Sequence, residues 1–270
     1  MAEKYAIAAL SALVLAALPS LGFADEQEWY RPQAAAKWQI QLDGKVNPSY
    51  PVEIYDIDLF DASDELIHKL HDSGKRVVCY FSAGSSEKWR EDFSRFRPSD
   101  MGKPLKGWAG EKWLDVRSQN VREIMESRMD LAVQKGCDGI DPDNVDGYTN
   151  KPGLPFTAED QLNYNRFLAQ QGHKRHLAVG LKNDMGQAEA LADDFDFSVN
   201  EQCFEYDECD KLEPFIERNK PVLNIEYKSP YVKDVKERRK LCKQSRNMKF
   251  STLILPLKLN DKFRYSCLED

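Results

Sequence analysis

The sequence predicts a (β/α)8 barrel, in which eight parallel strands alternate with helices around one core. Short apolar runs alternate with amphipathic stretches, eight of the runs have the length of strands, and about 250 residues hold them. A doubly wound open sheet is the alternative, but its first strand usually leads into a glycine-rich phosphate turn. Here the first run continues into Gly44 and Lys45 without such a turn. No internal repeat or low-complexity linker interrupts the pattern, so we expect a single domain.

The expected strands are the eight apolar or alternating runs. They span residues 37–42, 52–57, 76–82, 139–143, 177–181, 195–201, 221–227 and 251–257. Most of the intervals between them carry a helical pattern, which favours a parallel sheet.

Helix signals mark these intervals in order. Ser63 is the expected N-cap of the first helix, which Gly74 ends. Residues 120–135 carry apolar side chains at i, i+3 and i+4 spacing and stop at a glycine. Thr157, followed by an aspartate three residues later, resembles the capping box of the next helix. Two further helices, rich in charge, are expected at residues 212–219 and 232–245.

Residues 1–24 differ from the rest and have the pattern of a secretory signal peptide. An apolar run at residues 6–18 precedes Gly22 and Ala24, which place small residues at the cleavage positions. The run is short for a membrane span, although a membrane anchor is the alternative. Cleavage near Ala24 leaves residues 25–270 as a secreted domain without a membrane segment.

Six cysteines fit an exported chain, because an even number in that compartment suggests disulfides. The expected pairs are Cys203–Cys209 and Cys242–Cys267, with Cys79 and Cys137 near neighbouring strands and either paired or free. A zinc site is the alternative, but the chain has no CxxC and its four histidines show no zinc spacing. We therefore expect neither a metal nor another cofactor.

Charge and composition exclude several classes of protein. Hydrophobic residues make up 41% of the chain, which rules out a disordered protein. The net charge of −7, from 38 basic and 45 acidic residues, disfavours binding to nucleic acid. An acidic surface attracts cationic partners, although −7 over this length is also an ordinary charge for solubility.

The fourth expected strand carries the first candidate catalytic residues. Asp141 and Asp143 alternate along residues 139–143, so their side chains point to the same face. Two close carboxylates repel each other and the pKa of one should rise, which suits shared proton transfer. A calcium loop and a structural polar turn are the alternatives, but the EF-hand spacing is not met.

Glu201 ends the sixth expected strand, after apolar residues in alternation. An unpaired buried charge is costly, so this glutamate is either salt-bridged or functional. The ends of the fourth and sixth strands can face each other across the mouth of a barrel. Two carboxylates that flank the cleaved bond are what glycoside hydrolysis needs.

Other strand ends add polar side chains suited to a hydroxyl-rich ligand. The residues expected to contact substrate are Asp56, Tyr80, Asp115, Asp141, Asn144, Lys182, Asn200 and Tyr227. Four aromatic residues near the expected mouth either stack on sugar rings or pack within the protein. They are Trp89, Trp108, Trp113 and Tyr148.

Six motifs, in this order along the chain, resemble those of glycoside hydrolase family 114, the endo-α-1,4-polygalactosaminidase-like barrels. They are YDIDLFD (55–61), CYFSAGSSE (79–87), WLDVR (113–117), GCDGIDPDNVDGY (136–148), GLKN (180–183) and NEQCFEY (200–206). The resemblance runs from about residue 38 to residue 257. It implies a (β/α)8 fold, a secreted or cell-surface enzyme, and cleavage of α-1,4 linkages in a galactosamine-containing exopolysaccharide.

The resemblance also implies which residues are catalytic. Matched by motif, they are Asp143 in DNVD and Glu201 in NEQ, with Asp141 close enough to be an alternative. We expect Asp143 to be the nucleophile and Glu201 the acid/base, or the reverse. Asp56, Asp115 and Asp141 would then bind the ammonium groups of an amino-sugar polysaccharide, and the enzyme would act as a monomer. A carbohydrate-binding barrel without turnover and a surface adhesin are the other classes considered.

Overall fold

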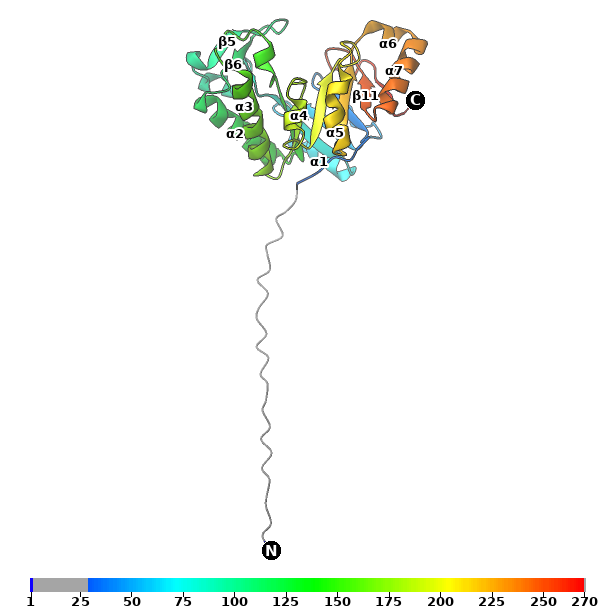
Figure 1. Cartoon of the computed structure of the whole chain (residues 1–270), viewed down its shortest axis with the longest axis horizontal. Helices are drawn as coiled ribbons and strands as arrows, with labels where there is room; N and C mark the ends of the chain where they lie inside the picture. Colours follow the sequence, from blue (N-terminus) through cyan, green and yellow to red (C-terminus); the bar gives the residue numbers. More distant parts are fainter. Residues whose placement is uncertain (2–28, 270) are drawn as a thin grey trace.

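The structure, a computed structural model, describes Met1 and residues 29–269. The predicted signal peptide and its cleavage site lie outside the described residues. Figure 1 shows strands surrounded by helices, with α2 and α3 on one side and α6 and α7 on the other.

Eight parallel strands form the main sheet in the order β1-β2-β3-β7-β8-β9-β10-β11. Their bounds are β1 Trp38–Gln41, β2 Ile54–Asp58, β3 Arg76–Ser82, β7 Gly139–Asp143, β8 Ala178–Lys182, β9 Phe197–Glu201, β10 Val222–Glu226 and β11 Ser251–Ile254. A short antiparallel strand, β12 (Tyr265–Ser266), follows β11 at the sheet edge. All eight predicted strands are present, and the predicted (β/α)8 fold is confirmed.

The two ends of the sheet meet through side chains and loops. The Trp38 indole on β1 donates a hydrogen bond of 2.7 Å to the Ser251 carbonyl on β11. Arg264, next to β12, donates to the Trp38 carbonyl at 3.1 Å. The Leu42 N–H donates to the Leu259 carbonyl at 3.1 Å. These contacts bring β1 beside β11 and complete the ring of strands.

Alternation along each strand gives the barrel wall an inner and an outer face. The inner face is filled by an apolar cluster from the strands and nearby loops, which includes Trp38, Ile40, Ile54, Val78, Phe197, Val199, Leu223, Ile225 and Leu253. The outer face packs against the helices, as Val179 and Ile57 do in the larger cluster with Ile67. Beyond the inner apolar layer, toward the carboxyl ends of the strands, inward side chains become polar.

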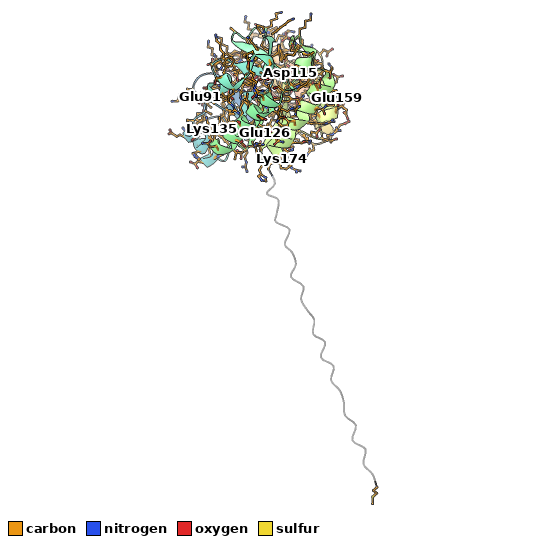
Figure 2. The ribbon with its side chains drawn as sticks, turned by 90° about the vertical axis from the view of Figure 1, so that its left-hand side faces the viewer. Glu91, Asp115, Glu126, Lys135, Glu159 and Lys174 are labelled. Carbon is orange, nitrogen blue, oxygen red and sulfur yellow. A yellow bond between two sulfur atoms is a disulfide. The ribbon has the colours of Figure 1, made fainter. Side chains whose placement is uncertain are left out.

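Seven α-helices occur among the described residues, and their caps follow the sequence signals. They are α1 Asp64–Asp72, α2 Gln119–Lys135, α3 Ala158–His173, α4 Ala188–Leu191, α5 Glu213–Glu217, α6 Ser229–Lys233 and α7 Val235–Asn247. Ser63 caps α1, Gly136 ends α2 in the left-handed conformation, and Thr157 forms the predicted capping box. The exposed faces of α2 and α3 carry charged residues such as Glu126 and Glu159 (Figure 2).

Two predicted helices differ from the structure. The helix expected at residues 212–219 is a 3-10 turn, η4 (Cys209–Leu212), followed by the shorter α5. The helix expected at residues 232–245 is divided at Asp234, whose extended backbone ends α6 and whose side chain accepts from the Lys236 N–H to begin α7. The spacing of apolar residues does not reveal this break, because the break depends on a hydrogen bond from the Lys236 N–H to the Asp234 side chain.

The segment after β3 forms a small antiparallel sheet that the sequence did not predict. Its order is β4-β6-β5, from β4 Ser85–Glu87, β6 Glu111–Leu114 and β5 Met101–Pro104. Two 3-10 turns, η1 Glu91–Arg95 and η2 Pro98–Asp100, lie between β4 and β5, and a third, η3 Gly147–Thr149, follows β7. We call residues 83–118 the insertion. In Figure 1, β5 and β6 lie on the same side of the barrel as α2 and α3.

Three disulfides link the six cysteines: Cys79–Cys137, Cys203–Cys209 and Cys242–Cys267. Both predicted pairs are confirmed, and the third joins β3 to the segment before β7. In the part of the chain that the structure describes, no helix has the length and apolar character needed to cross a bilayer.

Candidate active site

The main pocket lies at the carboxyl ends of the parallel strands and encloses about 600 Å³. Tyr80, Asp143, Lys182 and Glu201 line it from β3, β7, β8 and β9. Further lining comes from three leucines near the ends of β1 and β11, from the insertion, and from the loop after β7. These residues include Leu42, Leu257, Leu259, Trp108, Glu111, Trp113, Asp146 and Lys151. The pocket therefore combines charged and phenolic groups with apolar and aromatic walls.

Asp143 is held by both its side chain and its backbone. The Tyr80 hydroxyl donates to Oδ2 at 2.8 Å, and the Asn144 N–H donates to Oδ1 at 2.7 Å. The Asp143 carbonyl accepts the N–H groups of Ala83 and Gly84 from the start of the insertion. Burial, together with the charge of Asp143, raises the pKa of Tyr80, so the tyrosine remains a donor at neutral pH.

Glu201 is held in a similar way from β8 and β10. The hydroxyl of Tyr227 donates to Oε1, and Asn183 Nδ2 donates to Oε2 at 3.3 Å. The Asn183 side-chain oxygen accepts the Glu201 N–H at 2.9 Å. Burial and the charge of Glu201 raise the pKa of Tyr227, so this second tyrosine also remains protonated.

Lys182 lies between the two carboxylates and links them. Its Nζ is 3.5 Å from Asp143 Oδ1, 3.6 Å from Glu201 Oε2 and 3.7 Å from Asp141 Oδ2. Burial lowers the pKa of Lys182, but the surrounding carboxylates raise it well above its usual value, so the lysine is charged. One cation among three carboxylates leaves a negative excess, which favours a cationic ligand.

The chain turns sharply after each of the three strands that carry these residues. Asn144, Asn183 and Gln202 have φ angles of 62°, 51° and 66°. Non-glycine residues rarely adopt this left-handed conformation, and such residues concentrate at functional sites. Each of these residues directly follows a charged inward side chain, namely Asp143, Lys182 or Glu201.

Asp56 and Asp141 form a buried pair beneath this layer. Neither side chain lines the pocket, and their residues are only 1% and 0% exposed. No group of the described residues donates a hydrogen bond to their carboxylate oxygens. Burial and mutual repulsion raise the pKa of Asp56, while burial, Asp143 and Glu201 raise that of Asp141 to about 7 against the charge of Lys182. Asp56 and Asp141, which we expected to bind substrate ammonium groups, therefore lie beneath the lining of the pocket.

Three other predicted contacts, Asp115, Asn200 and Tyr227, are also absent from the pocket lining. Asp115 accepts hydrogen bonds of 2.8 and 2.9 Å from the Arg117 guanidinium outside the pocket. Asn200 precedes the inward Glu201 and so faces outward, where its side chain donates to Asn183 and Met185. Tyr80 and Tyr227 hold the two carboxylates, as described above, and Lys182 and Asn144 line the pocket as predicted. Of the four aromatic candidates, Trp108 and Trp113 line the pocket, whereas Trp89 and Tyr148 do not.

Ser82, Ser85 and Glu111 form a further hydrogen-bonded group at the site. Ser82 ends the third expected strand and is a weaker strand-end candidate from the sequence, whereas Ser85 and Glu111 are not among the expected site residues. Ser85 Oγ donates to Glu111 Oε2 at 2.7 Å and lies 2.7 Å from Ser82 Oγ. Asn144 Nδ2 donates to Ser82 Oγ at 3.0 Å. This chain of hydrogen bonds connects Glu111 in the pocket wall to the residue that follows Asp143. A serine-rich run after an expected strand was the signal in the sequence.

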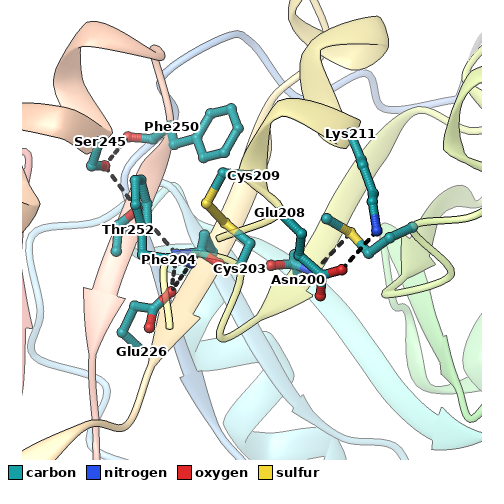
Figure 3. Close-up of a disulfide and its surroundings, with 12 residues drawn as sticks. Asn200, Cys203, Phe204, Glu208, Cys209, Lys211, Glu226, Ser245, Phe250 and Thr252 are labelled. Atoms are coloured by element: carbon teal, nitrogen blue, oxygen red, sulfur yellow. Dashed lines mark hydrogen bonds and ion pairs between the residues drawn. A yellow bond between two sulfur atoms is a disulfide. The ribbon is translucent and has the colours of Figure 1, made fainter. Parts of the chain in front are cut away.

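A second group of buried polar side chains lies on the outer face of the strands, between β10, β11 and α7. We call Asn224, Glu226, Ser245 and Thr252 the outer polar cluster. Glu226 Oε1 accepts from the Phe204 N–H at 2.9 Å and from Asn224 Nδ2 at 3.3 Å. Figure 3 shows Glu226, Ser245 and Thr252 beside the Cys203–Cys209 disulfide. Glu226 is fully buried, and burial raises its pKa to about 7 against the effect of its hydrogen bonds.

Nothing in residues 29–269 resembles a metal centre, since no three His, Cys, Asp or Glu side chains are grouped to hold an ion. Among the carboxylates that line the pocket, Asp143 and Glu201 stand at the ends of parallel strands, with side chains 18% and 26% exposed.

Comparison with known proteins places the chain among carbohydrate-cleaving enzymes. The family model for glycoside-hydrolase family GH114 matches residues 19–270. The crystal structure of Aspergillus fumigatus Ega3 in complex with galactosamine is similar over 89% of this chain and 98% of that chain, with 41% identity and a TM-score of 0.84. No match is found among curated protein sequences.

A more distant similarity extends the comparison of folds. The glycoside hydrolase domain of PelA from Pseudomonas aeruginosa covers 85% of this chain and 98% of its own, with 14% identity and a TM-score of 0.66. At this identity the likeness concerns the fold alone.

Proposed function

Since the chain belongs to glycoside-hydrolase family GH114, and so is a glycoside hydrolase, we propose that Asp143 and Glu201 cleave α-1,4 linkages in a galactosamine-containing exopolysaccharide. The observation that carries the proposal is the pair of pocket carboxylates on β7 and β9, both in contact with Lys182. The similar Ega3 binds galactosamine, which supports an amino-sugar substrate. The negative excess around Lys182 favours the same class of ligand.

Asp143 is the proposed nucleophile and Glu201 the proposed acid/base. Asp143 is the less exposed of the two and is fixed by Tyr80 and the Asn144 N–H, which orients its carboxylate toward the pocket. Glu201, with one more methylene and greater exposure, reaches the oxygen that links two sugars. It donates its proton to that oxygen while Asp143 forms a bond to the anomeric carbon. Glu201 then takes a proton from the water that releases the sugar from Asp143.

The spacing of the carboxylates favours retention of the anomeric configuration. Asp143 Oδ1 and Glu201 Oε2 both lie about 3.5 Å from Lys182 Nζ, so these oxygens are at most about 7 Å apart. Carboxyl groups stand about 5–5.5 Å apart in retaining glycosidases and about 6.5–9.5 Å apart in inverting ones. The limit set by Lys182 includes the retaining range, and we propose retention on this basis together with the assignment of Asp143 as nucleophile.

The experiment is hydrolysis of an α-1,4-linked galactosamine polymer by the wild type, Asp143→Asn and Glu201→Gln. We expect new reducing ends with the wild type and a loss of at least about 100-fold in each variant. Full activity in both variants would overturn the catalytic assignment. Binding of the polymer without release of product by the wild type would instead favour a carbohydrate-binding barrel.

We also propose that residues 1–24 are removed on export and that residues 25–270 act as a secreted monomer. Three disulfides support an oxidising compartment. N-terminal sequencing of protein from the medium, together with its mass in solution, tests this. A retained leader or a stable dimer would contradict it.

A further inference from the structure

We propose that Glu111 determines substrate specificity by binding the free ammonium group of an amino sugar in the pocket. The proposal rests on the function proposed above and adds to it a residue and a preference for deacetylated over N-acetylated units. It assigns this role to a residue of the pocket lining, whereas Asp56, Asp115 and Asp141 lie outside that lining.

Glu111 begins β6 of the insertion and lines the pocket together with Asp143 and Glu201. The residue is 7% exposed, so its carboxylate is largely withdrawn from bulk water. Ser85 Oγ donates to Oε2 at 2.7 Å, whereas Oε1 accepts no hydrogen bond from the described residues. One oxygen is therefore fixed by the protein, and the other is available to a ligand.

Glu111 also differs from the neighbouring Glu87, which forms salt bridges with two arginines. Glu87 stands directly opposite Glu111 in the β4–β6 ladder, where two like charges destabilise each other. Glu87 is balanced by Arg90 at 3.1 Å and Arg128 at 3.8 Å. Within residues 29–269, no lysine, arginine or histidine forms a salt bridge with Glu111. A buried carboxylate without a partner is costly, so a bound ammonium group would relieve a strain that the free protein carries.

The titration of Glu111 agrees with this geometry. Burial raises its pKa to about 7, the charges of Glu87 and Asp143 add to the rise, and the Ser85 hydrogen bond and Arg90 oppose it. Near neutral pH the side chain is therefore divided between its two forms. An ammonium group favours the ionised form, and a neutral acetamide offers no such gain.

Glu111 is also fixed relative to the reacting carboxylate. The chain of hydrogen bonds through Ser85 and Ser82 reaches Asn144, whose N–H holds Asp143. An ammonium group on Glu111 would therefore place its sugar at a defined position relative to the nucleophile.

Among the described residues, Asp146 is the other carboxylate of the pocket lining that forms no salt bridge. It lies in the loop after β7, as does the exposed Lys151, and its side chain accepts a hydrogen bond from Asn150 at 3.4 Å. Because it is more exposed than Glu111, we expect it to discriminate less.

The test compares kcat/KM on α-1,4-galactosamine oligosaccharides that are either fully deacetylated or fully N-acetylated. We expect Glu111→Gln to lower kcat/KM on the deacetylated substrate about 10- to 100-fold and on the acetylated one by no more than about two-fold. Glu159→Gln on the exposed face of α3 removes the same charge far from the pocket and is the matched control (Figure 2). Equal losses on both substrates, or no loss on either, would overturn the proposal.

A binding measurement separates this proposal from the proposed hydrolysis. Calorimetry with free galactosamine and free N-acetylgalactosamine needs no turnover. We expect the wild type to prefer galactosamine and Glu111→Gln to lose that preference, with folding of both checked by thermal unfolding. If Glu111→Gln keeps the preference, the role of Glu111 is wrong. If the wild type cleaves neither oligosaccharide, the proposed function is wrong whatever the binding result.

Discussion

Glu201 ends β9 and Glu226 ends β10, the next strand of the same sheet, yet their side chains lie on opposite faces of the barrel wall. Glu201 follows inward Val199, reaches the pocket and lies beside Lys182. Glu226 is one residue out of phase with inward Ile225 and is buried beneath the loop of the Cys203–Cys209 disulfide (Figure 3). The position of each glutamate in the strand alternation thus decides whether its side chain lines the pocket or supports a loop outside the barrel.

The two glutamates also differ in the groups that contact their carboxylates. Glu201 has a lysine, a tyrosine and an asparagine around its carboxylate. Glu226 has only the Phe204 N–H and an asparagine amide, and its Oε2 has no partner among the described residues. Burial raises the pKa of Glu226 to about 7, and its hydrogen bonds oppose this rise only in part.

The largest expected difference between the two glutamates is in kcat after each is replaced by glutamine. Glu201→Gln should lower kcat by about 10²–10⁴-fold, because the leaving oxygen loses its proton donor. Glu226→Gln should keep kcat within about three-fold, because the amide oxygen still accepts the Phe204 N–H. Initial rates on the polymer measure both. A loss in Glu226→Gln as large as that in Glu201→Gln would break the distinction between the two faces.

Lys182→Met tests whether the stability of the protein depends on the positive charge of Lys182 beside Asp141, Asp143 and Glu201. The substitution leaves Asp141 buried without a positive neighbour, so we expect a loss of about 3–5 kcal/mol in the free energy of unfolding. Urea denaturation measures it. The control is Lys211→Met, which removes an exposed ion pair with Glu208 and should cost less than about 1 kcal/mol. Equal stability of the wild type and Lys182→Met would show that Lys182 does not compensate these charges.

Glu226 should make stability depend on pH in a definite direction. Its pKa is about 7 in the folded protein against an ordinary value of 4.5, so the unfolded chain releases this proton first. The stabilisation is complete below about pH 4.5 and is lost as pH rises to about 7, up to about 3 kcal/mol for this group. Glu226→Gln removes this contribution, so its stability relative to the wild type should increase from pH 4.5 to pH 7. Parallel pH profiles for the two proteins would contradict the assignment.

The sequence predicts the barrel well because each strand is a local pattern. The eight apolar runs and their helix caps depend on neighbours within a few residues. The alternation that places Asp141, Asp143 and Glu201 on the inner face also places Asn200 outside, so its position was predictable. The burial of Asp56 and Asp141 was not, because alternation indicates a face and not a depth.

The insertion was missed for a different reason. Its strands are only three or four residues long, and Glu111 meets Ser85 across a ladder that joins residues distant in sequence. Asp115 instead pairs with Arg117, only two residues away, outside the pocket lining. The pairing of distant strands places Glu111 in the pocket wall, and a local ion pair holds Asp115 outside it.

The most direct test of the paired carboxylates is the configuration of the product at the moment of cleavage. Time-resolved proton NMR of the new reducing end follows the anomeric signal before mutarotation. With Asp143 as nucleophile and Glu201 as acid/base, two displacements return the configuration, so the α-anomer should appear first. First appearance of the β-anomer would contradict the account, because it requires a single displacement by water.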